Sequence, residues 1–93
     1  MGVVAAVNVT DTATLVIPQN TKRTSFYLLN NGVAQIYVGE NSAITTADGF
    51  PLAAASQVSE DEGSNIYKGD IYAICAAVDS PVELRYWERN QGV

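Results

Sequence analysis

The sequence predicts an all-β fold, either a single antiparallel β-sandwich or a jelly-roll-like barrel of about eight short strands. Two observations support this prediction. Apolar residues alternate with polar ones, or form short β-branched runs, and no window shows them at helical spacing. Residues typical of turns also interrupt every run. They are Pro18, Asn31-Gly32, Gly39, Asp48-Gly49, Pro51, Gly63, Gly69 and Ser80-Pro81.

Strands are expected, in chain order, at residues 3–9, 13–17, 24–29, 35–38, 57–59, 66–68, 71–77 and 82–88. The chain has 93 residues, the length of one domain with one core, and shows no repeat or linker. We therefore expect residues 1–93 to form a single sandwich domain.

The N-terminal segment, residues 1–9, is apolar and carries no charged side chain. A β-prone segment of this kind would form an exposed sheet edge unless another strand paired with it. We expect it to pair at an edge or to exchange with a neighbouring subunit, with Val3, Val4 and Val7 as candidate contacts.

The strands at 24–29 and 35–38 flank Asn31-Gly32, a typical hairpin signal. A three-residue loop, 30–32 or 31–33, gives each strand a consistent apolar face, because a shift of one residue turns a strand over. In the first of these loops, Gly32 would take the left-handed conformation. The pairing predicts that Tyr27 and Tyr37 are neighbours on the face opposite the core. The expected core face holds Phe26, Leu28, Ala34, Ile36 and Val38.

The strand at 71–77 is apolar on both faces, as expected of a central strand. The next strand alternates an inward set, Val82, Leu84 and Tyr86, with outward Glu83, Arg85 and Trp87. Trp87 thus falls on a charged face. A large aromatic side chain there is either covered by a loop or held against another chain.

Composition excludes several classes of function. The net charge is −5, and the five basic residues are scattered, so we expect neither nucleic-acid nor membrane-surface binding. The longest apolar run, residues 71–78, is far shorter than the roughly 18 residues of a membrane span. With no visible targeting segment, the protein is expected to be soluble and made in a cytoplasm.

Little in the sequence indicates catalysis or metal binding. The chain has no histidine, and its single cysteine, Cys75, lies in an apolar strand that favours a buried, inert thiol. The acidic run at 60–62 could hold an ion, but a charged turn is the simpler interpretation. We expect no enzymatic activity, no cofactor and no metal site.

Aromatic residues are the feature of the sequence that indicates a binding surface. Five tyrosines and one tryptophan could stack on sugar rings, fill strands, or contact another protein. These alternatives stay open at this point. The candidate contact residues are Tyr27, Tyr37 and Trp87.

Several short motifs resemble those of small β-sandwich proteins of tailed-bacteriophage virions, which include head-decoration or cement proteins and head-fibre or tail-accessory proteins. The motifs are an "NNG" hairpin at 30–32, "YVG" at 37–39, "G-x-P-L" at 49–52 and "YAI" at 72–74, before a last strand. The likeness covers residues 23–85. It departs at 53–56, where Ala-Ala-Ala-Ser replaces a glycine-containing turn.

The resemblance implies a structural, non-enzymatic role in a virion assembled from parts made in the host bacterial cytoplasm. The expected function is that of a capsid decoration or cement subunit, which binds the assembled major capsid protein or another virion protein. A homo-oligomer is expected, with a trimer as the first guess. The alternative is a glycan-binding module of a phage fibre or tail accessory protein, with Tyr27, Tyr37 and Trp87 as its platform.

Overall fold

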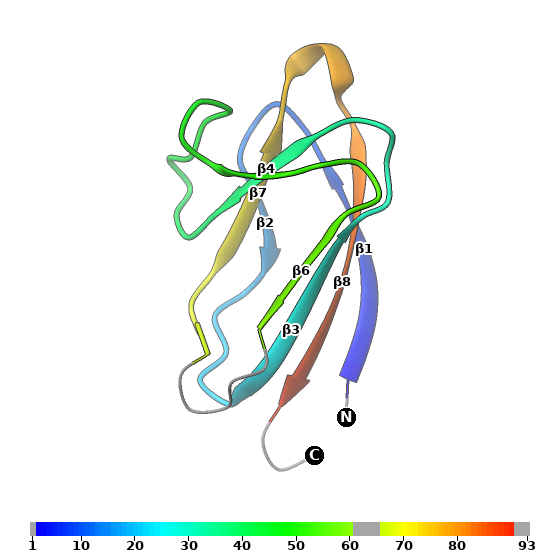
Figure 1. Ribbon diagram of the computed structural model, residues 1–93. Coiled ribbons are helices and arrows are strands. Elements are labelled where there is room, and N and C mark those ends of the chain that lie inside the picture. The colour runs from blue at the N-terminus through cyan, green and yellow to red at the C-terminus, as the bar shows by residue number, and fades with distance from the viewer. Residues whose placement is uncertain (1, 61–65, 91–93) are drawn as a thin grey trace.

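The protein is a β-sandwich of two antiparallel four-stranded sheets, seen in a computed structural model (Figure 1). The structure describes residues 2–60 and 66–90, and only the backbone of residues 2–4 and 90. One sheet has the order β1-β8-β3-β6 and the other the order β2-β7-β4-β5. The strands are β1 (Gly2–Val9), β2 (Thr14–Ile17), β3 (Arg23–Asn30), β4 (Ile36–Gly39), β5 (Phe50–Leu52), β6 (Gln57–Glu60), β7 (Ile71–Cys75) and β8 (Val82–Asn90).

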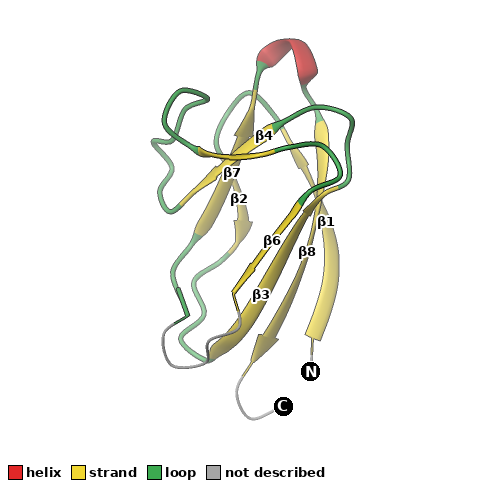
Figure 2. Cartoon of the chain, viewed as in Figure 1, coloured by secondary structure: helices red, strands yellow, loops and turns green. Residues whose placement is uncertain are grey.

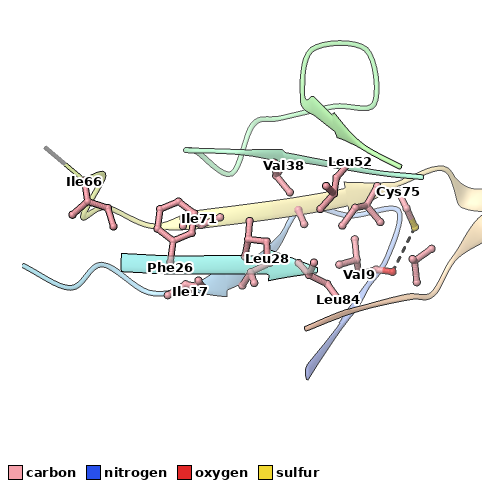
Figure 3. Close-up of a cluster of buried hydrophobic side chains, with 14 residues drawn as sticks. Val9, Ile17, Phe26, Leu28, Val38, Leu52, Ile66, Ile71, Cys75 and Leu84 are labelled. Carbon is pink, nitrogen blue, oxygen red and sulfur yellow. Dashed lines mark hydrogen bonds between the residues drawn. The ribbon is translucent and has the colours of Figure 1, made fainter. Parts of the chain in front are cut away.

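A single hydrophobic core fills the space between the sheets. Figure 3 shows Phe26 and Leu28 of β3 directed towards the opposite sheet, which contributes Val38 and Leu52. Cys75 is 1% exposed, and its Sγ lies 3.5 Å from the carbonyl oxygen of Val9. The expected all-β sandwich and the buried cysteine are therefore confirmed.

The predicted hairpin at Asn31-Gly32 is wrong, although its face assignment is right. β3 and β4 belong to different sheets, so the segment between them crosses the sandwich. Phe26, Leu28, Ile36 and Val38 are all buried, because both strands turn their apolar face to the same interior.

Buried Asn30 holds this crossover. Its Nδ2 donates to the carbonyl oxygens of Ala34 (2.8 Å) and Leu52 (2.9 Å), and its Oδ1 accepts from the Gly32 N–H (3.0 Å). Gly32 does not have the expected left-handed φ. It is required for space instead, since a Cβ there would lie 2.5 Å from Cγ1 of Val82.

Three further expectations about strands are corrected. Residues 66–68 form no strand, whereas Phe50–Leu52 does, because Pro51 is tolerated on the edge strand β5. β7 ends at Cys75 and a 3-10 helix, Ala77–Asp79, follows it (Figure 2). The turn before β6 forms without glycine, as the sequence at 53–56 requires, because Ala55 takes φ 64°.

The N-terminal segment forms β1, which pairs along its whole length with β8 of the same chain. It lies at the outer edge of its sheet (Figure 1). Edge pairing of this segment within the chain is thus observed, and its other side pairs with no strand among the described residues.

Candidate functional site

The outward side chains of β3, β6 and β8 form a continuous surface, which we call the aromatic face. Tyr27 pairs directly with Trp87 across the two strands, and Leu29 pairs with Arg85. Side chains alternate along a strand, so the same alternation that buries Leu28 and Leu84 turns these residues outward. The aromatic face consists of Tyr27, Leu29, Gln57, Arg85, Trp87 and Arg89.

Tyr27 and Trp87 stack on each other at the centre of this face. Their ring centroids are 5.3 Å apart and their planes are inclined by 25°. The guanidinium of Arg89 lies 4.8 Å from the centroid of the Trp87 ring, within the range of a cation–π contact. Trp87 is therefore held in place by two neighbours, and both rings remain half-exposed.

A shallow hollow lies beside the stacked pair. Side chains of the aromatic face line it: Tyr27, Leu29, Gln57, Arg85 and Trp87. Its surface is mostly apolar, with an amide and a guanidinium at its border. Tryptophan, tyrosine and arginine are also the residues most enriched among the strongest contacts of protein interfaces.

The charge of the aromatic face contrasts with that of the whole chain. The net charge is −5, yet β8 places Arg85 and Arg89 outward here together with one carboxylate, Glu83. Arg85 and Glu83 are 3.7 Å apart, and both side chains are partly exposed, so their interaction is weak. The face therefore combines aromatic surface with a local excess of positive charge.

The same two strands carry a very different arginine inside the sandwich. Arg23 is 0% exposed, and its Nε donates to Oε2 of Glu88 at 2.7 Å. Its terminal nitrogens donate to the carbonyl oxygens of Pro18 (2.8 Å), Tyr67 (2.9 Å) and Gly69 (3.1 Å). These contacts join two loops to β8, so Arg23 stabilises one end of the fold.

Sequence reasoning missed this buried pair. The pairing of β3 with β8 shifts register between Arg23 and Ser25, and this bulge turns Arg23 inward. One signal was visible, because Glu88 continues the inward series of Val82, Leu84 and Tyr86. The bulge itself has no corresponding signal in the sequence.

Two of the other predicted contact residues, Tyr37 and Val7, do not join the aromatic face. Tyr37 lies on β4 in the opposite sheet, so the expectation that Tyr27 and Tyr37 are neighbours is wrong. Val7 is half-buried and packs against the core. The backbone of Val3 and Val4 pairs with Glu88 and Trp87, and their side chains lie outside the described residues.

A second hollow, of about 370 Å³, opens between the sheets beside β6 and β4. It is lined mainly by apolar side chains such as Phe50 and Val58, with Glu40 and Glu60 also in its lining. The carboxylate of Glu60 accepts a hydrogen bond from the Tyr67 N–H at 3.0 Å. Glu60 thus already helps to hold the 66–70 loop.

Among the described residues, three titratable groups have shifted pKa values, and local structure explains each. Burial raises the pKa of the Cys75 thiol, which makes it a poor nucleophile. Burial, followed by the charges of Glu40 and Asp70, raises the pKa of Tyr67. Hydrogen bonds from the Thr45 N–H and hydroxyl lower the pKa of Asp48.

Within residues 2–60 and 66–90, no group of three or more His, Cys, Asp or Glu side chains is arranged to hold a metal ion. The acidic run singled out in the sequence continues into residues 61 and 62, which lie outside the described residues. No helix in the described part of the chain is long and apolar enough to cross a membrane.

Comparisons with known proteins bear on the fold. No protein-family model and no curated protein matches the sequence. Among solved structures, the chain is similar to one from Bacillus endospore appendages, described as a novel family of disulfide-linked pili. The TM-score is 0.53 and the identity 13%, over 97% of this chain and 84% of that chain. This similarity shows that the two chains share the β-sandwich fold.

Proposed function

We propose that this protein is a structural, non-enzymatic accessory subunit of a tailed-phage virion. In this proposal it is a decoration subunit that binds the assembled major capsid protein through the aromatic face. The stacked pair Tyr27–Trp87, half-exposed on a rigid sheet and flanked by arginines, is the observation that carries the docking function. The virion assignment rests on the motifs at 30–32, 37–39, 49–52 and 72–74.

The mechanism is binding that occurs only on the assembled shell. A stable contact buries about 800 Å² on each partner, more than the central pair alone can supply, so the surrounding polar side chains contribute as well. A ligand that binds only one state stabilises that state by mass action. The excess of positive charge on the face favours an acidic docking surface.

The similarity of fold to a pilus protein is compatible with a structural role of this chain in an assembly. That pilus is described as disulfide-linked. Cys75, the single cysteine of this chain, is buried and has a raised pKa, so we expect no equivalent disulfide between subunits.

Co-sedimentation with purified capsids of the parent phage tests the proposal. The wild type should pellet with expanded shells, and Arg89→Glu should weaken binding about fivefold or more, since an interface arginine can contribute over 1 kcal/mol. Lys22→Glu is the matched control, because it makes the same charge change at an exposed position outside the aromatic face. If the wild type stays in the supernatant with both immature and expanded shells, the decoration function is wrong.

A glycan-binding function is the second candidate, and the hollow beside Tyr27 and Trp87 favours it. Aromatic rings bind sugars through their faces, however, and stacking occupies one face of each of these rings. Tyr37 lies in the other sheet and cannot extend the platform. Trp87 is the single tryptophan, so its fluorescence reports binding directly. A shift or quench with one member of a glycan panel would favour this function over docking.

A further inference from the structure

The four edge strands of the sandwich differ in how they are protected against pairing with another chain. β2 has four residues and a register shift between Leu15 and Ile17. β5 has three residues and contains Pro51, and β6 has four residues and ends in Glu60. Short length, irregular register, proline and charge are the usual devices that prevent edge pairing. Each of these three edges carries at least one of them.

β1 carries none of these devices. It is eight residues long, Gly2–Val9, with no proline, no charged side chain and unbroken pairing to β8. Among the described residues, no strand pairs with its other side. Figure 1 shows β1 at the outer edge of the molecule. It therefore offers a long, regular and neutral edge.

The hydrogen bonds of the neighbouring strands show which groups of β1 are free. The Asn31 N–H donates to the carbonyl oxygen of Glu83, so the odd-numbered residues of β8 direct their backbone polar groups towards β3. The even-numbered residues of β8 must then face β1. Their partners on β1 are Val3, Ala5, Val7 and Val9.

The alternate residues of β1, which are Gly2, Val4, Ala6 and Asn8, therefore direct their N–H and C=O groups away from β8. The opposite side of β3 supports this parity. There the Asn30 N–H donates to Ser56 and the Asn30 carbonyl oxygen accepts from Ala55, as expected for an even-numbered residue of β3 that faces β6. Four regularly spaced donor–acceptor pairs thus line the free edge.

We infer that β1 pairs antiparallel with β1 of a second copy of this chain, about a two-fold axis at Ala6. In this register Ala6 lies opposite Ala6 of the partner subunit, and Val4 lies opposite Asn8 of the partner subunit. Three of the four free pairs, those of Val4, Ala6 and Asn8, are then used, which gives about six hydrogen bonds. The contact joins two four-stranded sheets into one and places both aromatic faces on the same side.

A second copy fits this edge for two reasons. The strand is uncharged, so identical strands meet without repulsion, and alanine at the axis leaves room for its symmetry mate. The nearest charges on this face lie on β8, and Arg85 of one copy would be three strand spacings, about 14 Å, from the equivalent arginine. At that distance the repulsion is largely screened.

This inference goes beyond the proposed function, because it concerns contact between copies and stands whatever the docking partner is. It also yields a dimer, not the trimer expected from the sequence. Sedimentation equilibrium over a wide dilution series should show a mass rising from 9.9 kDa towards twice that value. Ala6→Lys should hold the mass at 9.9 kDa, because a lysine on an edge opposes its own copy at the axis. A wild type that stays monomeric at all concentrations, or an equal dimer of Ala6→Lys, would overturn the inference.

Cross-linking tests the register in an otherwise intact chain. Ala6→Cys places two thiols at the axis, where the Cα atoms of a hydrogen-bonded pair are about 5.5 Å apart, so oxidation should give a covalent dimer. In the matched variant Asn8→Cys, the two thiols are about 13 Å apart along the strands and should stay reduced. Cys75 is buried and does not interfere. Equal cross-linking of the two variants, or a mass of three chains, would rule out this two-fold pairing.

Discussion

Strands β3 and β8 are joined by two side-chain contacts, one on each side of the same sheet, and the two contacts differ in burial and in their expected role. Inside, Arg23 bonds to Glu88 and to three backbone carbonyl oxygens, and it is 0% exposed. Outside, Tyr27 stacks on Trp87 with both rings half-exposed. Trp87 and Glu88 are adjacent in sequence, so strand alternation alone separates the two contacts.

The difference lies in what each contact leaves unused. The guanidinium of Arg23 makes four hydrogen bonds within the chain, and its partners come from two loops and a strand. Such a group stabilises the fold and offers little to a ligand. The outer pair leaves ring surface and the nearby Arg85 and Arg89 accessible. We therefore expect substitutions inside to change stability, and substitutions outside to change binding.

The largest expected effect is that of Arg23→Ala. It leaves the Glu88 carboxylate and three carbonyl oxygens without their donor, and the loss of one partner of a buried pair costs roughly 3 to 5 kcal/mol. Arg85→Ala is the matched control on the same sheet. Its 3.7 Å ion pair is exposed, so the change should stay below about 1 kcal/mol. Urea unfolding of both variants measures the difference, and equal losses would contradict the comparison.

A double substitution separates the ion pair from the carbonyl contacts. Replacing a buried ion pair by apolar residues is often neutral, so Arg23→Met with Glu88→Leu should restore stability if the pair alone matters. We expect the double variant to stay less stable than the wild type by about 2 kcal/mol, because the oxygens of Pro18, Tyr67 and Gly69 still lack a donor.

Asn30→Ala should have the next largest effect. Asn30 is 0% exposed and makes three hydrogen bonds that join β3 to the crossover and to β5. Leaving buried carbonyl groups unpaired costs about 1 to 3 kcal/mol, measurable as a lower urea midpoint. The neighbouring Asn31 is exposed and its side chain bonds to that of Glu83. Asn31→Ala should therefore lower the free energy of unfolding by only about a few tenths of a kcal/mol. The reverse order would show that the crossover is held elsewhere.

The outer pair should contribute less to folding. A double-mutant cycle with Tyr27→Leu and Trp87→Leu should give a coupling energy of about 0.5 to 1.5 kcal/mol, the usual value for an aromatic pair. The same cycle between Tyr37 and Trp87 should give no coupling, because these residues lie on different sheets. Coupling above that of the Arg23 contacts would mean that the aromatic face serves mainly to hold the fold.

These contacts also show what the sequence could and could not predict. Alternation identified the inward residues Phe26, Leu28, Ile36 and Val38, because it reports which side of its own sheet a residue faces. It does not report which strand lies next to it. A hairpin and a crossing between two sheets give the same inward pattern, so the pairing of Tyr27 with Tyr37 was wrong.

For the aromatic face too, the sequence predicted which residues point outward but not which residues lie next to each other. Trp87 stood out because a large aromatic side chain fell on a charged face. Its partner Tyr27 was a candidate, but the stacking depends on the pairing of β3 with β8, strands far apart in sequence. The inward turn of Arg23 depends on a bulge, and no residue type signals it.

The smallest expected effect tests the turn that replaces the glycine-containing loop. Ala55 has φ 64°, a conformation that costs an alanine about 1 to 2 kcal/mol, whereas the extra freedom of an unfolded glycine costs about 0.5 to 1 kcal/mol. Ala55→Gly should therefore stabilise the protein by about 0.5 kcal/mol. Ala54→Gly is the matched control at an exposed position without positive φ, and it should destabilise by a similar amount. Opposite signs in chemical denaturation would show that the fold holds Ala55 in a conformation unfavourable for alanine, and equal signs would contradict it.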